Sequence, residues 1–133
     1  MAKRSTYTTA KPWGTEEVWA STHHSVGKLL HINKHQRLSR KYHRIKGHTV
    51  RVLSGILSIE VGPLTEGGEV ELISLFPGEA YHVPARMIHR FCAGPEDILL
   101  LELSASGPSD SVRLEDDYRR VTDIPERGPQ SDK

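Results

Sequence analysis

Short apolar runs separated by turn residues occupy most of the chain. The runs with the length and composition of strands are Leu29–Ile32, Thr49–Leu53, Ile56–Val61, Val70–Leu75, Tyr81–Val83 and Ile98–Leu103. Glycine and proline mark the turns between them, for example at Gly55 and at Pro77-Gly78. No long stretch has the helical period, so the pattern predicts an all-β sandwich or barrel in a single domain.

The two ends of the chain differ in composition from the middle. Residues 1–10 are polar and basic, and we expect a flexible or strand-exchanging arm there. Residues 122–133 combine proline, glycine and charges, which predicts a disordered tail and leaves residues 11–121 as the barrel. Within the barrel, Ser109–Arg120 is the one segment that the pattern allows to be a short helix, because Leu114 and Tyr118 lie one helical turn apart.

Composition narrows the class of protein. A chain of 133 residues suits one domain, and its single cysteine, Cys92, excludes an intramolecular disulfide. The formal net charge of +1 argues against nucleic acid as the main partner. No apolar stretch has the length of a membrane span or the features of a signal peptide, so we expect a cytoplasmic protein that does not bind membranes.

Positive charge is concentrated in one part of the chain. Between Lys28 and Arg51 there are eight Lys and Arg residues, four His residues and no acidic residue. A solvated basic edge explains such a run, and so does a site that attracts a small anion such as a sugar phosphate or a carboxylate. Both interpretations stay open, and under the second Lys28 and Arg51 are candidate substrate-binding residues.

Three histidines, His43, His48 and His89, form the strongest candidate site. Alternation along the strand puts His48 on the same face as Val50 and Val52, which should face the interior. His43 shares its face with Lys41 and Ser39, while Leu38, Arg40 and Tyr42 should point away. His43 and His48 can share the barrel interior only if Arg44–Gly47 bends, and a second bend through Ala85–Ile88 would bring in His89. Imidazole is a common metal ligand, so the pattern predicts a metal site.

Several segments carry a family resemblance. They are Lys11-Pro-Trp-Gly14, Leu38-Ser39, Tyr42-His43, Val52-Leu-Ser-Gly55, Pro77-Gly78-Glu79, Val83-Pro84, His89-Arg90 and Val112-Arg-Leu-Glu-Asp-Asp-Tyr118. Over about residues 11–119 the chain resembles the cupin superfamily, and more narrowly the cupin domain of type II mannose-6-phosphate isomerases. The resemblance implies a small jelly-roll β-barrel, also called a double-stranded β-helix.

The resemblance also implies a set of metal ligands, from which this chain departs. Such cupins typically offer a His or Gln, a second His two residues later, a Glu, and a later His. Here His43 and His89 match, whereas His48 stands where Glu is expected and Lys41 where the first ligand is common. Arg86 replaces a Gly that usually eases the turn before the last ligand. Three imidazoles favour Zn, with Fe(II), Ni or Mn as other divalent candidates; the alternative is a cupin that has lost its metal.

Other residues near the expected barrel mouth are candidates for catalysis. Lys41 could neutralise an anionic group or act as an acid or base, unless it is displaced to solvent. Tyr81 and His82 precede Val83-Pro84, and one of the two must point inward. Cys92 alternates away from His89 and is a poor ligand. We expect Trp19 to pack in a core.

The sequence leaves several functions open. The resemblance implies a metal-dependent isomerase or epimerase that acts on a sugar or sugar phosphate. A three-His site is also typical of Fe(II) oxygenases and of related rearrangement enzymes, and a non-catalytic metabolite-binding cupin is the remaining alternative. Under all of these we expect a homodimer, because a small barrel of this kind leaves apolar sheet faces to cover.

Overall fold

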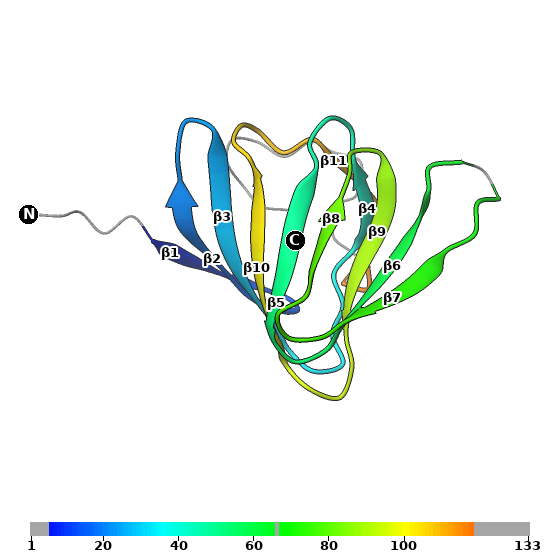
Figure 1. Cartoon of the computed structure of the whole chain (residues 1–133), viewed down its shortest axis with the longest axis horizontal. Coiled ribbons are helices and arrows are strands. Elements are labelled where there is room, and N and C mark those ends of the chain that lie inside the picture. The colour runs from blue at the N-terminus through cyan, green and yellow to red at the C-terminus, as the bar shows by residue number, and fades with distance from the viewer. Residues whose placement is uncertain (1–5, 66, 119–133) are drawn as a thin grey trace, which may run out of the picture.

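The computed structural model describes residues 6–65 and 67–118, which form two packed antiparallel sheets (Figure 1). The strands are β1 (Tyr7–Lys11), β2 (Gly14–Ser21), β3 (Ser25–Ile32), β4 (Arg40–His43), β5 (His48–Ser54), β6 (Leu57–Pro63), β7 (Glu71–Leu75), β8 (Ala80–Val83), β9 (Met87–Ala93), β10 (Ile98–Ala105) and β11 (Ser111–Glu115). One sheet has the order β1-β2-β3-β10-β5-β8 and the other β11-β4-β9-β6-β7. In these residues no helix is long and apolar enough to cross a membrane.

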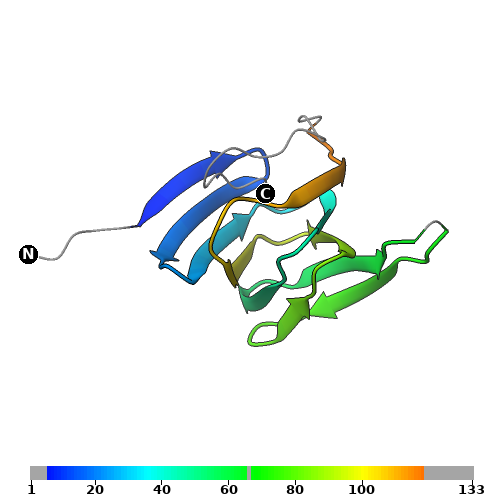
Figure 2. The same cartoon turned by 90° about the horizontal axis from the view of Figure 1, so that it is seen from above.

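The two sheets form the layers of a jelly roll, which is the predicted fold class (Figure 2). Consecutive strands often lie in different sheets, as β9 and β10 do, so the chain crosses between the layers repeatedly. Each of the six strands predicted from the apolar runs is present, with bounds that differ by a few residues. Short strands separated by glycine and proline turns therefore identified the fold class correctly.

The prediction that Ser109–Arg120 could hold a short helix is wrong. Ser111–Glu115 is the edge strand β11, which pairs with β4 so that Arg113 lies opposite Lys41. The spacing of Leu114 and Tyr118 carried no helical signal, because pairing with a neighbouring strand decided the backbone conformation.

The two ends of the chain are only partly described. Tyr7–Lys11, in the region expected to be an arm, forms β1 and pairs with β2 of the same chain. Residues 1–5 and the predicted tail, residues 122–133, lie outside the described part.

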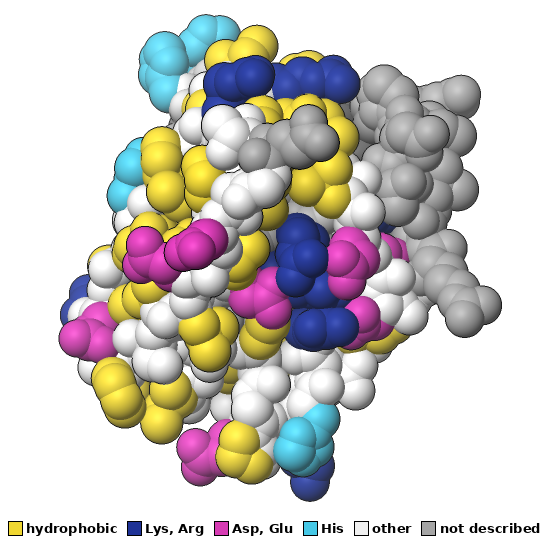
Figure 3. Space-filling view, turned by 90° about the vertical axis from the view of Figure 1, so that its right-hand side faces the viewer, with side chains coloured by type: hydrophobic (Ala, Val, Ile, Leu, Met, Phe, Trp, Pro, Cys, Tyr) yellow, Lys and Arg dark blue, Asp and Glu magenta, His cyan; other side chains and the backbone are white. Residues whose placement is uncertain are grey.

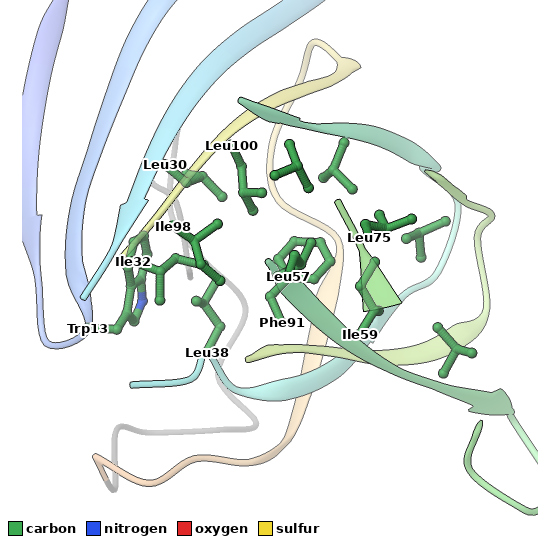
Figure 4. Close-up of a cluster of buried hydrophobic side chains, with 14 residues drawn as sticks. Trp13, Leu30, Ile32, Leu38, Leu57, Ile59, Leu75, Phe91, Ile98 and Leu100 are labelled. Carbon is green, nitrogen blue, oxygen red and sulfur yellow. The ribbon is translucent and has the colours of Figure 1, made fainter. Parts of the chain in front are cut away.

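Strand alternation accounts for the core. Along β5 the residues alternate between buried and exposed, with His48, Val50 and Val52 inside as predicted. The inner faces of both sheets contribute to one apolar cluster in the barrel interior (Figure 4). Trp13 and Phe91 are its largest members, with exposures of 0% and 2%. This packed cluster holds the two sheets together by burial of apolar surface.

Leu38 and Trp19 differ from expectation. Leu38 was expected to point away from the interior but is 2% exposed in the core. It precedes β4, and its N–H donates to the carbonyl of Phe91 outside the regular ladder, so strand parity does not extend back to it. Trp19, expected in a core, is 45% exposed and lies across Gly27, where a Cβ would come within 2.6 Å of the indole ring.

Basic and acidic side chains gather side by side on the face of the molecule shown in Figure 3. In the five-stranded sheet, Arg90 is fully buried, and its guanidinium donates to Glu115 at 3.2 Å and to Asp117 at 3.0 Å. Its Nε also donates to the carbonyl of Leu38 at 2.9 Å. Arg40 joins Glu115 to Glu60 through two further ion pairs. These contacts fasten the C-terminal strand to the sheet that carries His43 and His89.

Candidate metal centre

The three predicted histidines come together inside the barrel. His43 ends β4, His48 begins β5 and His89 lies in β9. Their possible ligand atoms all lie within 4.8 Å of one another, and no other such group of His, Cys, Asp or Glu occurs in the described ranges. His48 and His89 are 3% and 2% exposed. The prediction that these residues form one cluster is confirmed.

The bend that the cluster requires lies between β4 and β5. The carboxylate of Asp110 accepts hydrogen bonds from the N–H groups of Ile45 at 2.6 Å and Lys46 at 2.8 Å, which holds the loop in place. At Gly47 the chain passes close to its neighbours, since a Cβ would lie 3.0 Å from the His82 ring and 3.1 Å from the carbonyl oxygen of Val83. Because of this bend, His43 and His48 both reach the interior despite their odd spacing in sequence.

The second bend lies between β8 and β9. Arg86 has a φ of 68°, in the left-handed region that favours glycine. Its N–H donates to the carbonyl of His43 at 2.7 Å, which ties the turn to the end of β4. The turn then leads into β9, where alternation places His89 and Phe91 inside, as predicted.

Each histidine is oriented through its Nδ1 atom. Nδ1 lies 2.6 Å from Glu102 in His48, 3.2 Å from Asp110 in His43 and 3.0 Å from the carbonyl of Met87 in His89. A carbonyl oxygen and an ionised carboxylate can only accept, so each Nδ1 carries the proton and donates it. In the neutral ring the lone pair is then on Nε2, the atom that binds a metal.

Two of these Nε2 atoms face each other. Nε2 of His48 lies 3.2 Å from Nε2 of His89. Burial, followed by the charge on His48, lowers the pKa of His89 well below its usual range, so this ring is neutral near pH 7. Two acceptor atoms at this distance repel unless a cation or a proton lies between them.

A metal ion fits this donor set. Zn²⁺ bound to imidazole nitrogens at about 2.0–2.1 Å holds those nitrogens roughly 3.4 Å apart, close to the 3.2 Å between Nε2 of His48 and Nε2 of His89. All the ligand atoms lie within 4.8 Å of one another, so the widest separation would have to shorten by at most about 1.4 Å. Three neutral nitrogen donors suit Zn, Fe(II) or Ni rather than Mg or Ca, which prefer oxygen ligands.

Cationic side chains lie in the barrel interior with the histidines, on the inner faces of both sheets. Lys41, whose position was uncertain from sequence, is 2% exposed and lies opposite His89 in the sheet. Arg113 is 8% exposed, lies opposite Lys41 and donates from Nε to Ser39 at 3.3 Å. Lys28 also faces inward from β3, with its Nζ 3.6 Å from Glu16.

The other predicted site residues divide between the two faces of the six-stranded sheet. Tyr81 lies on the inner face and packs against the core. His82 is exposed on the outer face, where its Nδ1 lies 2.9 Å from Oγ1 of Thr49. Arg51 is also exposed on that face, so the structure brings neither Arg51 nor His82 to the histidines.

Three residues of the site were missed at the level of sequence. Glu102 alternates with Ile98 and Leu100 along β10, so strand parity alone could have placed it inside. Arg113 was hidden by the helix considered for its segment. Asp110 lies in a loop, and no local pattern signals that its carboxylate reaches His43 across 67 positions of the chain.

Comparison with known proteins places the fold but gives no close relative. No family model matches the sequence, and no curated protein matches it significantly. Among solved structures, the capsular polysaccharide assembling protein CapF from Staphylococcus aureus has a TM-score of 0.75 at 14% identity over 85% of this chain. The match covers only 33% of CapF, so this chain spans about a third of that protein.

Two further solved structures are similar to this chain in fold. An uncharacterised protein with a double-stranded β-helix domain from Klebsiella pneumoniae has a TM-score of 0.63 at 22% identity, covering 75% of this chain and 83% of its own. A protein named as a candidate sugar phosphate isomerase, from Acidithiobacillus ferrooxidans, has a TM-score of 0.54 at 19% identity, covering 64% and 52%. These likenesses support the fold and not the narrower resemblance to mannose-6-phosphate isomerases. The chain has the double-stranded β-helix fold of the cupins.

Proposed function

We propose that this protein is a metal-dependent enzyme that acts on a small anionic metabolite, with isomerase or epimerase chemistry on a sugar or sugar phosphate. One observation carries the proposal: three histidines that converge through Nε2 lie in the barrel interior together with two buried cations, Lys41 and Arg113. A three-His set leaves coordination positions open for substrate oxygens. The cations provide an attraction for a negatively charged group beside them.

The histidines would bind the metal, and the groups behind them would orient the rings. His43, His48 and His89 would hold a divalent metal, Zn by preference of the donor set, and the metal when bound would polarise a substrate carbonyl and acidify the adjacent carbon. Asp110, Glu102 and the carbonyl of Met87 keep the three rings in the correct tautomer.

Substrate binding and proton transfer fall to other side chains of the inner face. Lys41 and Arg113 would bind the phosphate or carboxylate, and Lys28 faces the barrel interior from the opposite sheet. Lys41 is close enough to His89 for its charge to lower the pKa of that ring, which makes it the candidate for moving the proton. Tyr81, also on the inner face, is the second candidate.

The structural neighbours support a sugar substrate. CapF is named for assembly of a capsular polysaccharide, and the Acidithiobacillus protein for sugar phosphate isomerisation. Because these neighbours are only distantly similar in sequence, they support the proposal only at the level of substrate class.

One observation favours a second candidate function. The carboxylate of the site, Glu102, bonds to His48 at 2.6 Å, so the ligand set is nitrogen only. Three imidazoles around Fe(II) are the arrangement of oxygenases that bind O₂ and substrate at the open positions. Oxygen consumption by iron-loaded protein with candidate thiols separates this function from isomerisation.

The decisive experiment combines metal analysis with a substrate panel. Purified protein is analysed for bound metal and assayed for isomerisation of sugar phosphates, with and without EDTA. We expect about one metal per chain, turnover of at least one member and loss of both on chelation. His89→Ala should abolish metal binding, whereas His82→Ala, a histidine on the outer face, should leave it unchanged. A protein that neither contains nor takes up metal, and turns over no member, would be a metabolite-binding cupin instead.

A further inference from the structure

The outer face of the six-stranded sheet is apolar along its centre. Its outward apolar side chains are Trp19, Leu29, Leu53, Leu99, Leu101 and Leu103. Trp19, Leu53 and Leu103 are 45%, 42% and 53% exposed. An antiparallel sheet that faces water on one side normally alternates apolar-in and polar-out, so this composition indicates a surface that is covered.

Opposite charges flank the centre of this face. Strands β2, β3, β10 and β5 are neighbours in the six-stranded sheet (Figure 1). Glu17 of β2, Leu29 of β3, Leu101 of β10 and Arg51 of β5 lie in one row across them. Glu17 is half-buried and Arg51 is exposed. Within residues 6–65 and 67–118, neither has an ion-pair partner. The row therefore has an acidic residue at one end, two apolar residues in the middle and a basic residue at the other end. The two charged residues are equally far from the midpoint between Leu29 and Leu101.

We propose that a second copy of this chain covers the face and forms a two-fold symmetric dimer. An axis that runs along the strands between Leu29 and Leu101, in the plane between two such faces, brings Glu17 of each copy opposite Arg51 of the other. The same rotation brings Leu29 opposite Leu101. One surface thus supplies both halves of a self-complementary interface, as two-fold symmetry requires.

The neighbouring rows fit the same arrangement. Trp19 lies across Gly27 on one side of the axis, and Leu103 lies on the other. Rotation brings Leu103 of one copy against the Trp19–Gly27 surface of the second copy, so a leucine meets an indole rather than a charge. His31 and Leu99 also exchange places about the axis.

The size of the face suits a moderately strong dimer. The four central strands have seven or eight residues each. At about 3.3 Å per residue and 4.8 Å between strands, they span roughly 25 by 20 Å, or about 500 Å² per copy. Two copies then bury about 1,000 Å², the lower limit for a specific interface. We therefore expect the dissociation constant of the dimer to lie in the micromolar range.

Charge reversal tests the symmetry directly. Sedimentation of the full chain should show a dimer at tens of micromolar. Glu17→Arg and Arg51→Glu should each weaken the dimer at least about tenfold, because each change creates two like-charge contacts. The double variant should return the dissociation constant to within about threefold of wild type. Glu71→Arg, on the edge strand of the other sheet, is the matched control and should change nothing.

The outcomes separate the possible occupants. Unchanged thermal midpoints in all four variants would show that folding is not the cause of dissociation, since Glu17 and Arg51 lie at the surface. A monomeric wild type would overturn the proposal and leave the face to another partner. A dimer that survives both single reversals, or a double variant that stays dissociated, would overturn it as well. Metal content plays no part in this test, so the result is independent of the proposed enzymatic function.

Discussion

The carboxylate of Glu102 accepts a hydrogen bond of 2.6 Å from Nδ1 of His48, and both side chains are buried. The two residues come from neighbouring strands, β10 and β5. The family resemblance leads one to expect a carboxylate ligand at position 48. Instead, the chain has a histidine there and a carboxylate behind it. The site therefore keeps its negative charge, but the carboxylate contacts the histidine ligand instead of the metal position.

Glu102→Gln should lower metal affinity by about 10- to 100-fold. The amide of Gln can donate to Nδ1, which favours the tautomer with the proton on Nε2 and removes the lone pair that binds metal. Competition with a chromophoric chelator for Zn²⁺ or Co²⁺ measures the change. Glu71→Gln, at the exposed β7 edge, is the control and should bind as wild type does. Equal affinities in the two variants would show that Glu102 does not orient His48.

Removal of the buried cations should act on substrate rather than on metal. Arg113→Met keeps most of the side-chain length but loses the guanidinium, which lies beside Lys41 on the inner face. We expect weaker binding of an anionic sugar phosphate by at least about tenfold, with metal content unchanged. Arg51→Met, on the outer face, is the matched control. Isothermal titration with metal-loaded protein tests both, and equal losses in the two variants would contradict an anion site at Arg113.

Arg86 offers a test of backbone strain. Its φ of 68° is readily adopted by glycine and costs other residues on the order of 1 kcal/mol. Arg86→Gly should therefore be more stable than Arg86→Ala by about 1 kcal/mol, since both remove the same exposed side chain. Urea unfolding measures the difference. Arg44→Gly and Arg44→Ala, at a neighbouring exposed position without positive φ, should show the opposite order.

Some of the site follows from sequence and some does not. Strand parity placed His48 inside because β5 alternates without interruption, and the same rule applied to β10 would have found Glu102. Parity failed at Leu38 because that residue lies before the strand begins. The roles of Asp110 and Arg113 depend on how the C-terminal segment packs beside β4, which is a tertiary contact that no local pattern encodes.

The Cys92 thiol should be unreactive near neutral pH. Burial, and next the Glu60 carboxylate, raise its pKa to about 11 from a reference of 9.0. At pH 8 the thiolate fraction is then about 100-fold below that of an unperturbed thiol, so alkylation by iodoacetamide should slow in proportion. The unfolded chain ionises first, so the stability from this group is complete below about pH 9 and is lost as pH rises toward 11. Rapid alkylation of folded protein at pH 8 would contradict the assignment.

Restoring the ligand type that the family resemblance implies should lower the stability of the folded protein. In His48→Glu, two carboxylates would meet where Glu102 now bonds to Nδ1 at 2.6 Å, in a position with almost no solvent. Without a metal, one of them must be protonated or both must separate, so we expect a loss of about 3 kcal/mol in the free energy of unfolding in EDTA. Adding Glu102→Gln should recover at least half of that loss, because an amide can donate to the new carboxylate. Urea unfolding of the single and double variants tests the idea. A single variant as stable as wild type would show that Glu102 is not what makes histidine necessary at position 48.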